Sequence, residues 1–239
     1  MCFAVEGNLS VAVAIMCKTP SPGSSKTRLS PPLAPDDCAK ISACFIEDLT
    51  RTIDGLRAFG VVGAAVYTPQ GSETALRRLL PAAFELVLQG EGGDLGDRLL
   101  QGTKDLLALG HKGVVLVNSD SPTLPQGILL QAVEAVRNGD CVVLSPAHDG
   151  GYTLIGLSRP HAWLFADIPW STSAVYDVTV ARAREIGLSV VDVPGWYDID
   201  DEASLRMLED ELEGVPLPFS RLAGADAPST RAFLGQRRR

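Results

Sequence analysis

The chain has 239 residues, 46% of them hydrophobic and 21% charged, so it is long enough to bury one sizeable core. Its formal net charge of -8 at pH 7 argues against a nucleic-acid partner, because binding to a phosphate backbone needs a basic face. The cysteines form no CxxC pair and stand mostly among apolar neighbours, which predicts reduced core thiols at Cys2, Cys17, Cys38, Cys44 and Cys141.

The first apolar run, residues 9–17, is too short to span a bilayer and has no basic segment before it. We therefore expect neither a membrane span nor a signal peptide, and a soluble cytoplasmic protein. The sequence does not determine the oligomeric state, and it is compatible with a homo-oligomer.

Apolar, β-branched runs alternate along the chain with amphipathic helical patterns. We expect strands at 11–16, 60–68, 84–89, 113–120, 141–147, 153–157 and 188–194, and helices at 35–59, 72–80, 95–109, 124–138, 173–186 and 201–213. Nearly continuous apolar strands are typical of a parallel sheet covered on both faces. The pattern predicts an α/β fold, doubly wound, with a mostly parallel central sheet. We expect one domain at 1–213 and an irregular C-terminal tail at 214–239, where periodicity is lost.

The loop after the first strand reads CKTPSPGSSKTRLS and carries Lys18, Gly23, Lys26 and Arg28. It is not a phosphate-binding P-loop, because that motif needs a glycine directly before the lysine and here Ser25 precedes Lys26. The strand nevertheless delivers this basic loop to the carboxyl edge of the sheet, where open α/β sheets bind ligands. The sequence thus favours a phosphate-binding loop, and the alternative is a solvated surface loop with scattered charges.

The fourth predicted strand ends in Asn118-Ser119-Asp120. An aspartate at a strand end can hold a divalent cation through its hard oxygen atoms, and the cation can bridge two phosphates. Asp120 could equally cap the helix that begins near Pro125. The sequence leaves both interpretations open.

The stretch SPAHDGGYTLIGL places two glycines between Asp149 and Tyr152. Gly150 and Gly151 allow the backbone to approach a ligand closely, which would suit an acceptor-side loop. A hairpin with a DG turn is the alternative interpretation. We interpret the neighbouring His148 as a bystander rather than a base.

The stretch IPWSTSAVY offers Trp170, Ser171 and Thr172 before a predicted helix. These residues are candidates for acceptor binding. Ser171 or Thr172 could instead serve as the helix N-cap.

The late acidic stretch WYDIDDEASL precedes another predicted helix. Alternate residues of an extended segment share a face, so Asp198 and Asp200 are predicted to point together while Asp201 serves the helix start. Neighbouring carboxylates repel each other unless a cation lies beside them. We predict that Asp200 reaches the same cation as Asp120, with Asp198 as a further partner; the alternative is a set of helix-capping acids.

Taken in order, KTPSPGSSKTRL, DLGDRL, NSDSPTLP, PAHDGGYTLIGL, PWST and WYDIDDEASL resemble the radical-SAM/selenodomain-associated glycosyltransferase-like transferases of bacteria. That family is related to the GT-A, or nucleotide-diphospho-sugar transferase, superfamily. The resemblance covers roughly residues 10–212. It implies a GT-A-like, Rossmann-like α/β sandwich with a nucleotide over the carboxyl edge of the sheet.

The resemblance also implies roles for the motif residues. Phosphate contacts fall on Lys26 and Arg28, and Lys18, Gly23 and Ser119 are predicted to join them in nucleotide binding. The catalytic residues are predicted to be Asp120 and Asp149. The predicted acceptor-binding residues are Gly150, Gly151, Tyr152, Trp170, Ser171 and Thr172. The predicted ligands of Mg²⁺ or Mn²⁺ are Asp120, Asp200 and Asp198. One departure concerns the metal: the usual Asp-x-Asp of many glycosyltransferases is Asn118-Ser119-Asp120 here.

The leading functional hypothesis is a transferase that uses a nucleotide-activated donor, a nucleotide sugar, with a divalent cation and a small-molecule acceptor. The alternative on the same scaffold is a guanylyltransferase-like nucleotidyltransferase, which joins a nucleoside monophosphate to a phosphorylated acceptor and releases pyrophosphate. A third hypothesis is a nucleotide-sugar-binding module without turnover, motivated by the single carboxylate of NSDSP.

Overall fold

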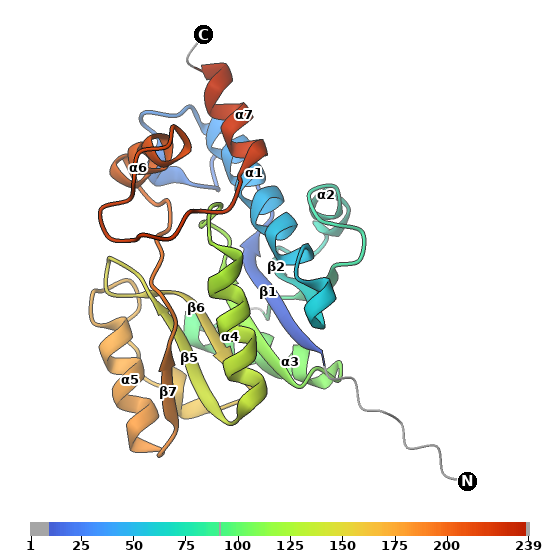
Figure 1. Cartoon of the computed structure of the whole chain (residues 1–239). Coiled ribbons are helices and arrows are strands. Elements are labelled where there is room, and N and C mark those ends of the chain that lie inside the picture. Colours follow the sequence, from blue (N-terminus) through green and yellow to red (C-terminus); the bar gives the residue numbers. More distant parts are fainter. Residues whose placement is uncertain (1–9, 91, 238–239) are drawn as a thin grey trace.

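The computed structural model describes residues 10–90 and 92–237, and within them one seven-stranded sheet organises the fold. The strand order is β3-β2-β1-β4-β6-β5-β7 (Figure 1). The strands are β1 (Val11–Lys18), β2 (Val61–Thr68), β3 (Glu85–Leu88), β4 (Gly113–Asn118), β5 (Cys141–Pro146), β6 (Tyr152–Leu157) and β7 (Ser189–Asp192). Every neighbouring pair is parallel except those of β6, which runs antiparallel to β4 and β5. The predicted α/β fold with a mostly parallel sheet is confirmed.

Helices connect the strands and cover both faces of the sheet. They are α1 (Pro35–Asp54), α2 (Glu73–Arg77), α3 (Leu95–Ala108), α4 (Gln126–Asn138), α5 (Val175–Glu185), α6 (Glu202–Leu212) and α7 (Pro228–Arg237), with 3-10 turns η1 (Thr27–Leu29), η2 (Arg57–Phe59) and η3 (Ala162–Phe165). The helix predicted at 35–59 is therefore two elements, because α1 ends at Gly55 and η2 follows. No helix in these two ranges combines the length and hydropathy that crossing a membrane requires.

Two apolar cores lie on opposite faces of the sheet. Alternate residues of β1 point to opposite sides, so Val13 and Ile15 enter the core with α1 and α4, whereas Ala12 and Ala14 enter the core with α3 and α5. At Gly102 of α3 an added Cβ would lie 3.3 Å from Val66, so this helix packs closely on the sheet. Cys17, Cys38 and Cys141 are buried free thiols, as predicted, whereas the free Cys44 is only half-buried, and Cys2 lies outside the described residues.

The strand register brings the predicted motifs to one edge of the sheet. Met16 of β1 pairs with Asn118 of β4, so the loops that follow these two parallel strands leave the sheet side by side. Because β6 is antiparallel, its first residue, Tyr152, pairs with Pro146 at the end of β5. The hairpin between β5 and β6 therefore opens at the same edge.

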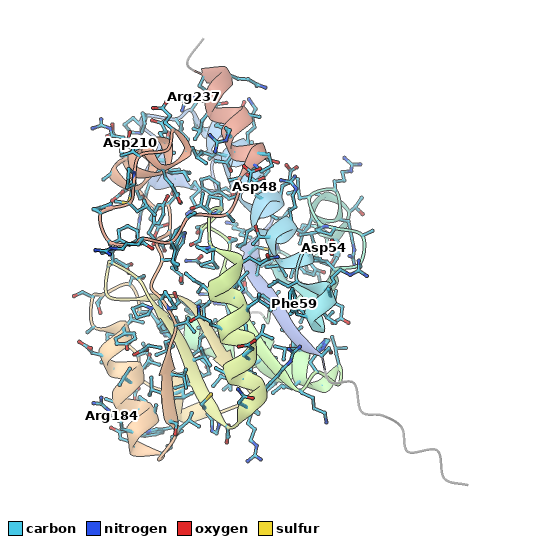
Figure 2. The ribbon with its side chains drawn as sticks, in the orientation of Figure 1. Asp48, Asp54, Phe59, Arg184, Asp210 and Arg237 are labelled. Carbon is cyan, nitrogen blue, oxygen red and sulfur yellow. The ribbon has the colours of Figure 1, made fainter. Side chains whose placement is uncertain are left out.

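The predicted irregular tail needs correction over residues 228–237, which form α7 and pack against α1. Asp48 of α1 is fully buried and accepts hydrogen bonds from the backbone N–H groups of Ser229 (3.0 Å) and Thr230 (2.8 Å). Figure 2 shows Asp48 beside the start of α7. These N–H groups have no partner within their own helix, so a remote carboxylate caps α7. No local sequence pattern could reveal such a cap.

Replacing Asp48 by Ala removes this cap and the 2.8 Å ion pair of Asp48 with Arg51, and leaves two N–H groups beside an apolar interface. We expect the free energy of unfolding to fall by about 2 kcal/mol, measured by urea titration. Asp54→Ala is the matched control, since Asp54 is the last residue of α1 and also forms an ion pair with an arginine three residues later, Arg57 (3.7 Å). Equal stabilities of the two variants would contradict a structural role for α7.

Candidate active site

A buried lysine joins the basic loop to the two acidic motifs at the carboxyl edge of the sheet. The Lys26 Nζ atom lies 2.7 Å from Asp120 Oδ2, 2.8 Å from Asp200 Oδ1 and 2.7 Å from the Ile199 carbonyl oxygen. Lys26 has a left-handed backbone conformation at the start of η1, where the fully buried Leu29 anchors the loop. The structure therefore brings together residues separated by more than 170 positions.

The environment of Lys26 favours its charged form. Burial alone would lower the pKa of this ammonium group, but the charges of Asp120 and Asp200 and the hydrogen bonds to them outweigh burial, so the pKa is raised above its ordinary value. Lys26 is therefore a fixed positive charge at neutral pH. The side chain of Lys26 is only 8% exposed, against 28% for Asp120 and 47% for Asp200, so the carboxylates remain accessible from solvent.

The backbone after β4 is joined to the late acidic stretch. The Ile199 N–H donates a hydrogen bond to the Asp120 carbonyl oxygen (3.0 Å), and the buried Ser121 hydroxyl lies 2.8 Å from the Tyr197 carbonyl oxygen and 2.9 Å from Asn118 Oδ1. These contacts fix the two acidic motifs beside each other. The N-cap residue of α4 is Pro125, without a side-chain cap, so Asp120 does not cap that helix and the capping interpretation was wrong for this residue.

Asp198 shows that negative charge is in excess at this site. Burial and the charges of Asp200, Asp149 and Asp120 raise the pKa of Asp198 from 3.8 to about 6, although Lys26 opposes the shift. Asp201, in contrast, caps α6 through a reciprocal pair of hydrogen bonds with Ser204, as predicted. The acidic stretch therefore divides into site carboxylates and one helix cap.

Two of the three predicted cation ligands, Asp120 and Asp200, contact the Lys26 ammonium. Carboxylate oxygens are the ligands that Mg²⁺ and Mn²⁺ prefer, and Asp120 and Asp200 already share one positively charged nitrogen atom between them. In the described part of the chain, no group of three or more His, Cys, Asp or Glu side chains is arranged to hold an ion. Cation binding by Asp120, Asp200 and Asp198 therefore stays a prediction.

A small cavity of about 330 Å³ opens beside the Lys26 ammonium. The predicted phosphate-binding residues line it together with two site carboxylates: Lys18, Lys26, Arg28, Ser119, Asp120 and Asp200. Larger hollows lie elsewhere, one of about 1010 Å³ near Arg137, but that one adjoins the opposite end of the strands and none of these charged residues. The small cavity is therefore the candidate phosphate site, and Gly23 contributes a left-handed turn (φ 72°) in the same loop.

Sequence reasoning missed several contributors to this cavity and its lysine. Ser42 of α1 lines the cavity, and the Ile199 carbonyl oxygen contacts Lys26. A serine within an amphipathic helix and a main-chain oxygen carry no local signal. Only the packing of α1 and of the 197–200 segment against the loop reveals them.

The predicted acceptor-side motifs lie against each other. The 149–151 segment is a tight connection between β5 and β6, so the hairpin interpretation was right about its form. Gly150 has φ 89°, and a Cβ there would lie 2.2 Å from the Ser173 carbonyl oxygen, so only glycine allows this approach. The Gly150 carbonyl oxygen accepts a hydrogen bond from the Tyr176 N–H (2.9 Å). Asp149 itself is exposed and accepts a hydrogen bond from the Gly151 N–H (2.9 Å).

The structure packs the half-buried Tyr152 against the core on the α3 and α5 face, and acceptor binding by this residue stays a prediction. The physical reason for this packing is a register shift between Ser145 and Pro146, which pairs Pro146 with Tyr152 and leaves Thr153 as an extra residue. One extra residue reverses the face to which a side chain points. Burial raises the pKa of Tyr152 above its ordinary value.

The side chains of Trp170 and Thr172 form hydrogen bonds with other groups of the protein. The Trp170 indole N–H donates to Asp94 Oδ2 (3.1 Å) at the start of α3. The Thr172 hydroxyl donates to the Pro169 carbonyl oxygen (2.7 Å), and the N-cap of α5 is Ala174, so the N-cap interpretation of Ser171 and Thr172 was wrong. Acceptor binding by these three residues stays a prediction.

Comparisons with known proteins place the chain in a family. The family described as "Uncharacterized protein conserved in bacteria (DUF2064)" matches residues 37–172, more than half of the chain. The chain belongs to this family. The matched range contains Asp120 and Asp149 and ends before Asp198 and Asp200. The further association with radical-SAM/selenodomain proteins stays a prediction, and no curated protein matches the chain.

Solved structures extend the similarity of this family member to nearly the whole chain. A crystal structure from Desulfovibrio desulfuricans G20 of a "putative nucleotide-diphospho-sugar transferase" has 28% sequence identity and a TM-score of 0.81, and covers 96% of each chain. A CMP:2-keto-3-deoxy-manno-octonic acid synthetase complexed with CTP has 10% identity and a TM-score of 0.56 over 86% of this chain and 99% of its own. A 4-diphosphocytidyl-2C-methyl-D-erythritol synthase from Anaerococcus prevotii DSM 20548 has 11% identity and a TM-score of 0.53 over 86% and 97%. At such low identity the last two share the fold alone.

Replacing Lys26 by Met keeps the length of the side chain and removes its charge. Asp120 and Asp200 then repel each other and Asp198 without compensation, so we expect the free energy of unfolding at pH 8 to fall by roughly 1–3 kcal/mol. Because the pKa of Asp198 is about 6, that carboxyl group is neutral at pH 5 and the repulsion is weaker there. The deficit of Lys26→Met should accordingly shrink between pH 8 and pH 5 in urea titrations.

The exposed Arg28 provides the matched control, since Arg28→Met removes a charge from the same loop. We expect a change within about 0.5 kcal/mol at both pH values. A deficit of Lys26→Met that is equal at pH 5 and pH 8 would contradict an electrostatic role and leave only lost packing.

Proposed function

We propose that this protein is a transferase that acts on a nucleotide-sugar donor, with the donor phosphates bound over the carboxyl edge of β1 and β4. The observation that carries the proposal is the buried Lys26 ammonium, held by Asp120 and Asp200 at the wall of a cavity that Lys18 and Arg28 also line. The similarity to the Desulfovibrio protein, at 28% identity over 96% of each chain, supports the same class of donor.

Each charged residue has a distinct task in the proposed reaction. Lys18, Lys26 and Arg28 stabilise the negative charge that develops on the leaving phosphate, and Lys26 exchanges a carboxylate partner for a phosphate oxygen to do so. Asp120 and Asp200, with Asp198, would hold Mg²⁺ or Mn²⁺, which when bound would neutralise the diphosphate and act as a Lewis acid. Asp149, which is exposed on the hairpin, would accept the proton of an attacking hydroxyl group.

A second candidate is nucleotidyl transfer, in which a phosphorylated acceptor attacks a nucleoside triphosphate. The specific observation that favours it is the presence of three cationic side chains, Lys18, Lys26 and Arg28, around one small cavity, because a triphosphate carries more negative charge than a diphosphate ester. The reaction products separate the two candidates. Glycosyl transfer releases a nucleoside diphosphate, and nucleotidyl transfer releases pyrophosphate.

A thermal-shift panel with UDP-, GDP-, CMP- and ADP-sugars and the four nucleoside triphosphates, each with and without Mn²⁺, tests the proposal. A donor that binds the folded state raises the melting temperature. We expect a nucleotide sugar to give the largest shift, and Arg28→Ala to weaken its binding by about one to two decades. Because Arg28 is exposed, the melting temperature of the free variant should not change.

Arg57→Ala is the matched control, because Arg57 is exposed in η2, away from the cavity. Its affinity should equal that of the unaltered protein. Binding that is saturable at one site but gives no product over many hours would favour a module without turnover. A panel in which no nucleotide shifts the melting temperature would overturn the proposal.

Asp120→Asn tests the predicted cation site separately. The amide keeps the shape of the side chain and loses the charge that a divalent cation needs. We expect the Mn²⁺-dependent part of nucleotide binding to disappear, measured by isothermal titration with and without Mn²⁺. Persistence of that part would place the cation elsewhere.

A further inference from the structure

The connection between α6 and α7, residues 213–227, passes over the end of the sheet that carries the site (Figure 1). It contains no helix or strand, yet it is anchored. The Ala225 N–H donates to the Thr123 carbonyl oxygen (2.8 Å), three residues after Asp120. Leu217 and Phe219 pack against the larger core. This segment is therefore fixed beside the loop that follows β4.

The Phe219 ring is the point of contact between this connection and the site segments. Its centroid lies 4.0 Å from that of His148 at an angle of 67°, and 5.7 Å and 6.3 Å from those of Tyr197 and Trp196. Edge-to-face arrangements of this kind are favourable beyond their buried area. Phe219 thus touches two segments that are far apart in sequence.

Both segments lead directly into site carboxylates. His148 immediately precedes Asp149, and Tyr197 immediately precedes Asp198. A displacement of either ring therefore moves the adjacent carboxylate. His148 is an exposed residue, so the surrounding core does not hold its side chain. Its ring contact with Phe219 supplies packing in place of burial.

A backbone contact also joins the two segments. An isolated β-bridge pairs Ala147 with Trp196. The Phe219 ring contacts His148, the next residue after Ala147, and Trp196 itself. The bridge and the aromatic contacts thus hold the 147–149 and 196–198 segments together.

We propose that Phe219 is a positioning residue, whose ring holds His148 and thereby keeps Asp149 beside the other carboxylates for reaction with the acceptor. The proposal rests on the proposed transferase function in its last clause only. The placement of the hairpin by Phe219 is a property of the free protein. The donor phosphates bind on the Lys26 side, so Phe219 should affect acceptor use and leave donor binding unchanged.

Hydrogen–deuterium exchange of the free protein tests the placement. The Ala147 N–H bonds to the Gly151 carbonyl oxygen (3.0 Å) and the Gly150 N–H to the Ala147 carbonyl oxygen (3.3 Å), so these two amides report on the hairpin. In Phe219→Ala we expect their exchange to accelerate by about three- to tenfold. Phe219→Tyr, which keeps the ring, should restore the original rates.

Phe233→Ala is the matched control, because Phe233 is also a partly buried phenylalanine of the C-terminal segment but lies on α7. It should leave the hairpin amides unchanged. Unchanged exchange in Phe219→Ala, or equal acceleration in both variants, would overturn the proposal by reducing Phe219 to general packing.

Kinetics with the nucleotide sugar that gives the largest thermal shift tests the role in the reaction. We expect Phe219→Ala to lower kcat/KM for the acceptor by about tenfold or more, with the KM for the donor within twofold of the original, and Phe219→Tyr to recover most of the loss. Faster exchange with unchanged kcat/KM would overturn the role in positioning Asp149. If no nucleotide binds at all, the proposed function fails, and the exchange rates still decide whether Phe219 places the hairpin.

Discussion

The Lys26 ammonium between Asp120 and Asp200 is the interaction on which the site depends. Four carboxylates meet at this edge of the sheet, and without a buried positive charge their repulsion would separate the segments that carry them. Lys26 supplies that charge, and its hydrogen bond to the Ile199 carbonyl oxygen ties the basic loop to the late acidic stretch. The same nitrogen atom therefore serves both the stability of the free protein and the proposed contact with a donor phosphate.

The antiparallel strand β6 determines which segments meet at this edge of the sheet. In a purely parallel sheet, the segment after β5 would need a helical crossover before the chain returned to the sheet. Here a tight hairpin returns the chain at once, so Asp149 opens beside the loop that follows β4. The proposed donor side comes from parallel strands and the proposed acceptor side from the one reversed strand. This separation follows from the directions of the strands and not from particular side chains.

The sequence predicted the features that depend on local pattern. Apolar runs located the strands, and the extended approach to α6 correctly separated Asp201, the helix cap, from Asp198 and Asp200. The features it could not predict depend on distant parts of the chain. The register shift that packs Tyr152 against the core is a property of strand pairing, and the use of Lys26 as a partner for two carboxylates depends on a fold that joins residues 26, 120 and 200.

The capping of α7 by Asp48 has a consequence for how the chain matures during synthesis. Asp48 is made 181 residues before Ser229, the first of its two N–H partners, and it ends fully buried. On a translating ribosome, α1 can pack against the sheet long before this carboxylate finds its partners. Until α7 emerges, Arg51 of α1, 2.8 Å from the Asp48 carboxylate, is the charged partner of Asp48 at the place where the last helix will dock. The N-terminal half of the fold is thus completed by the end of the chain.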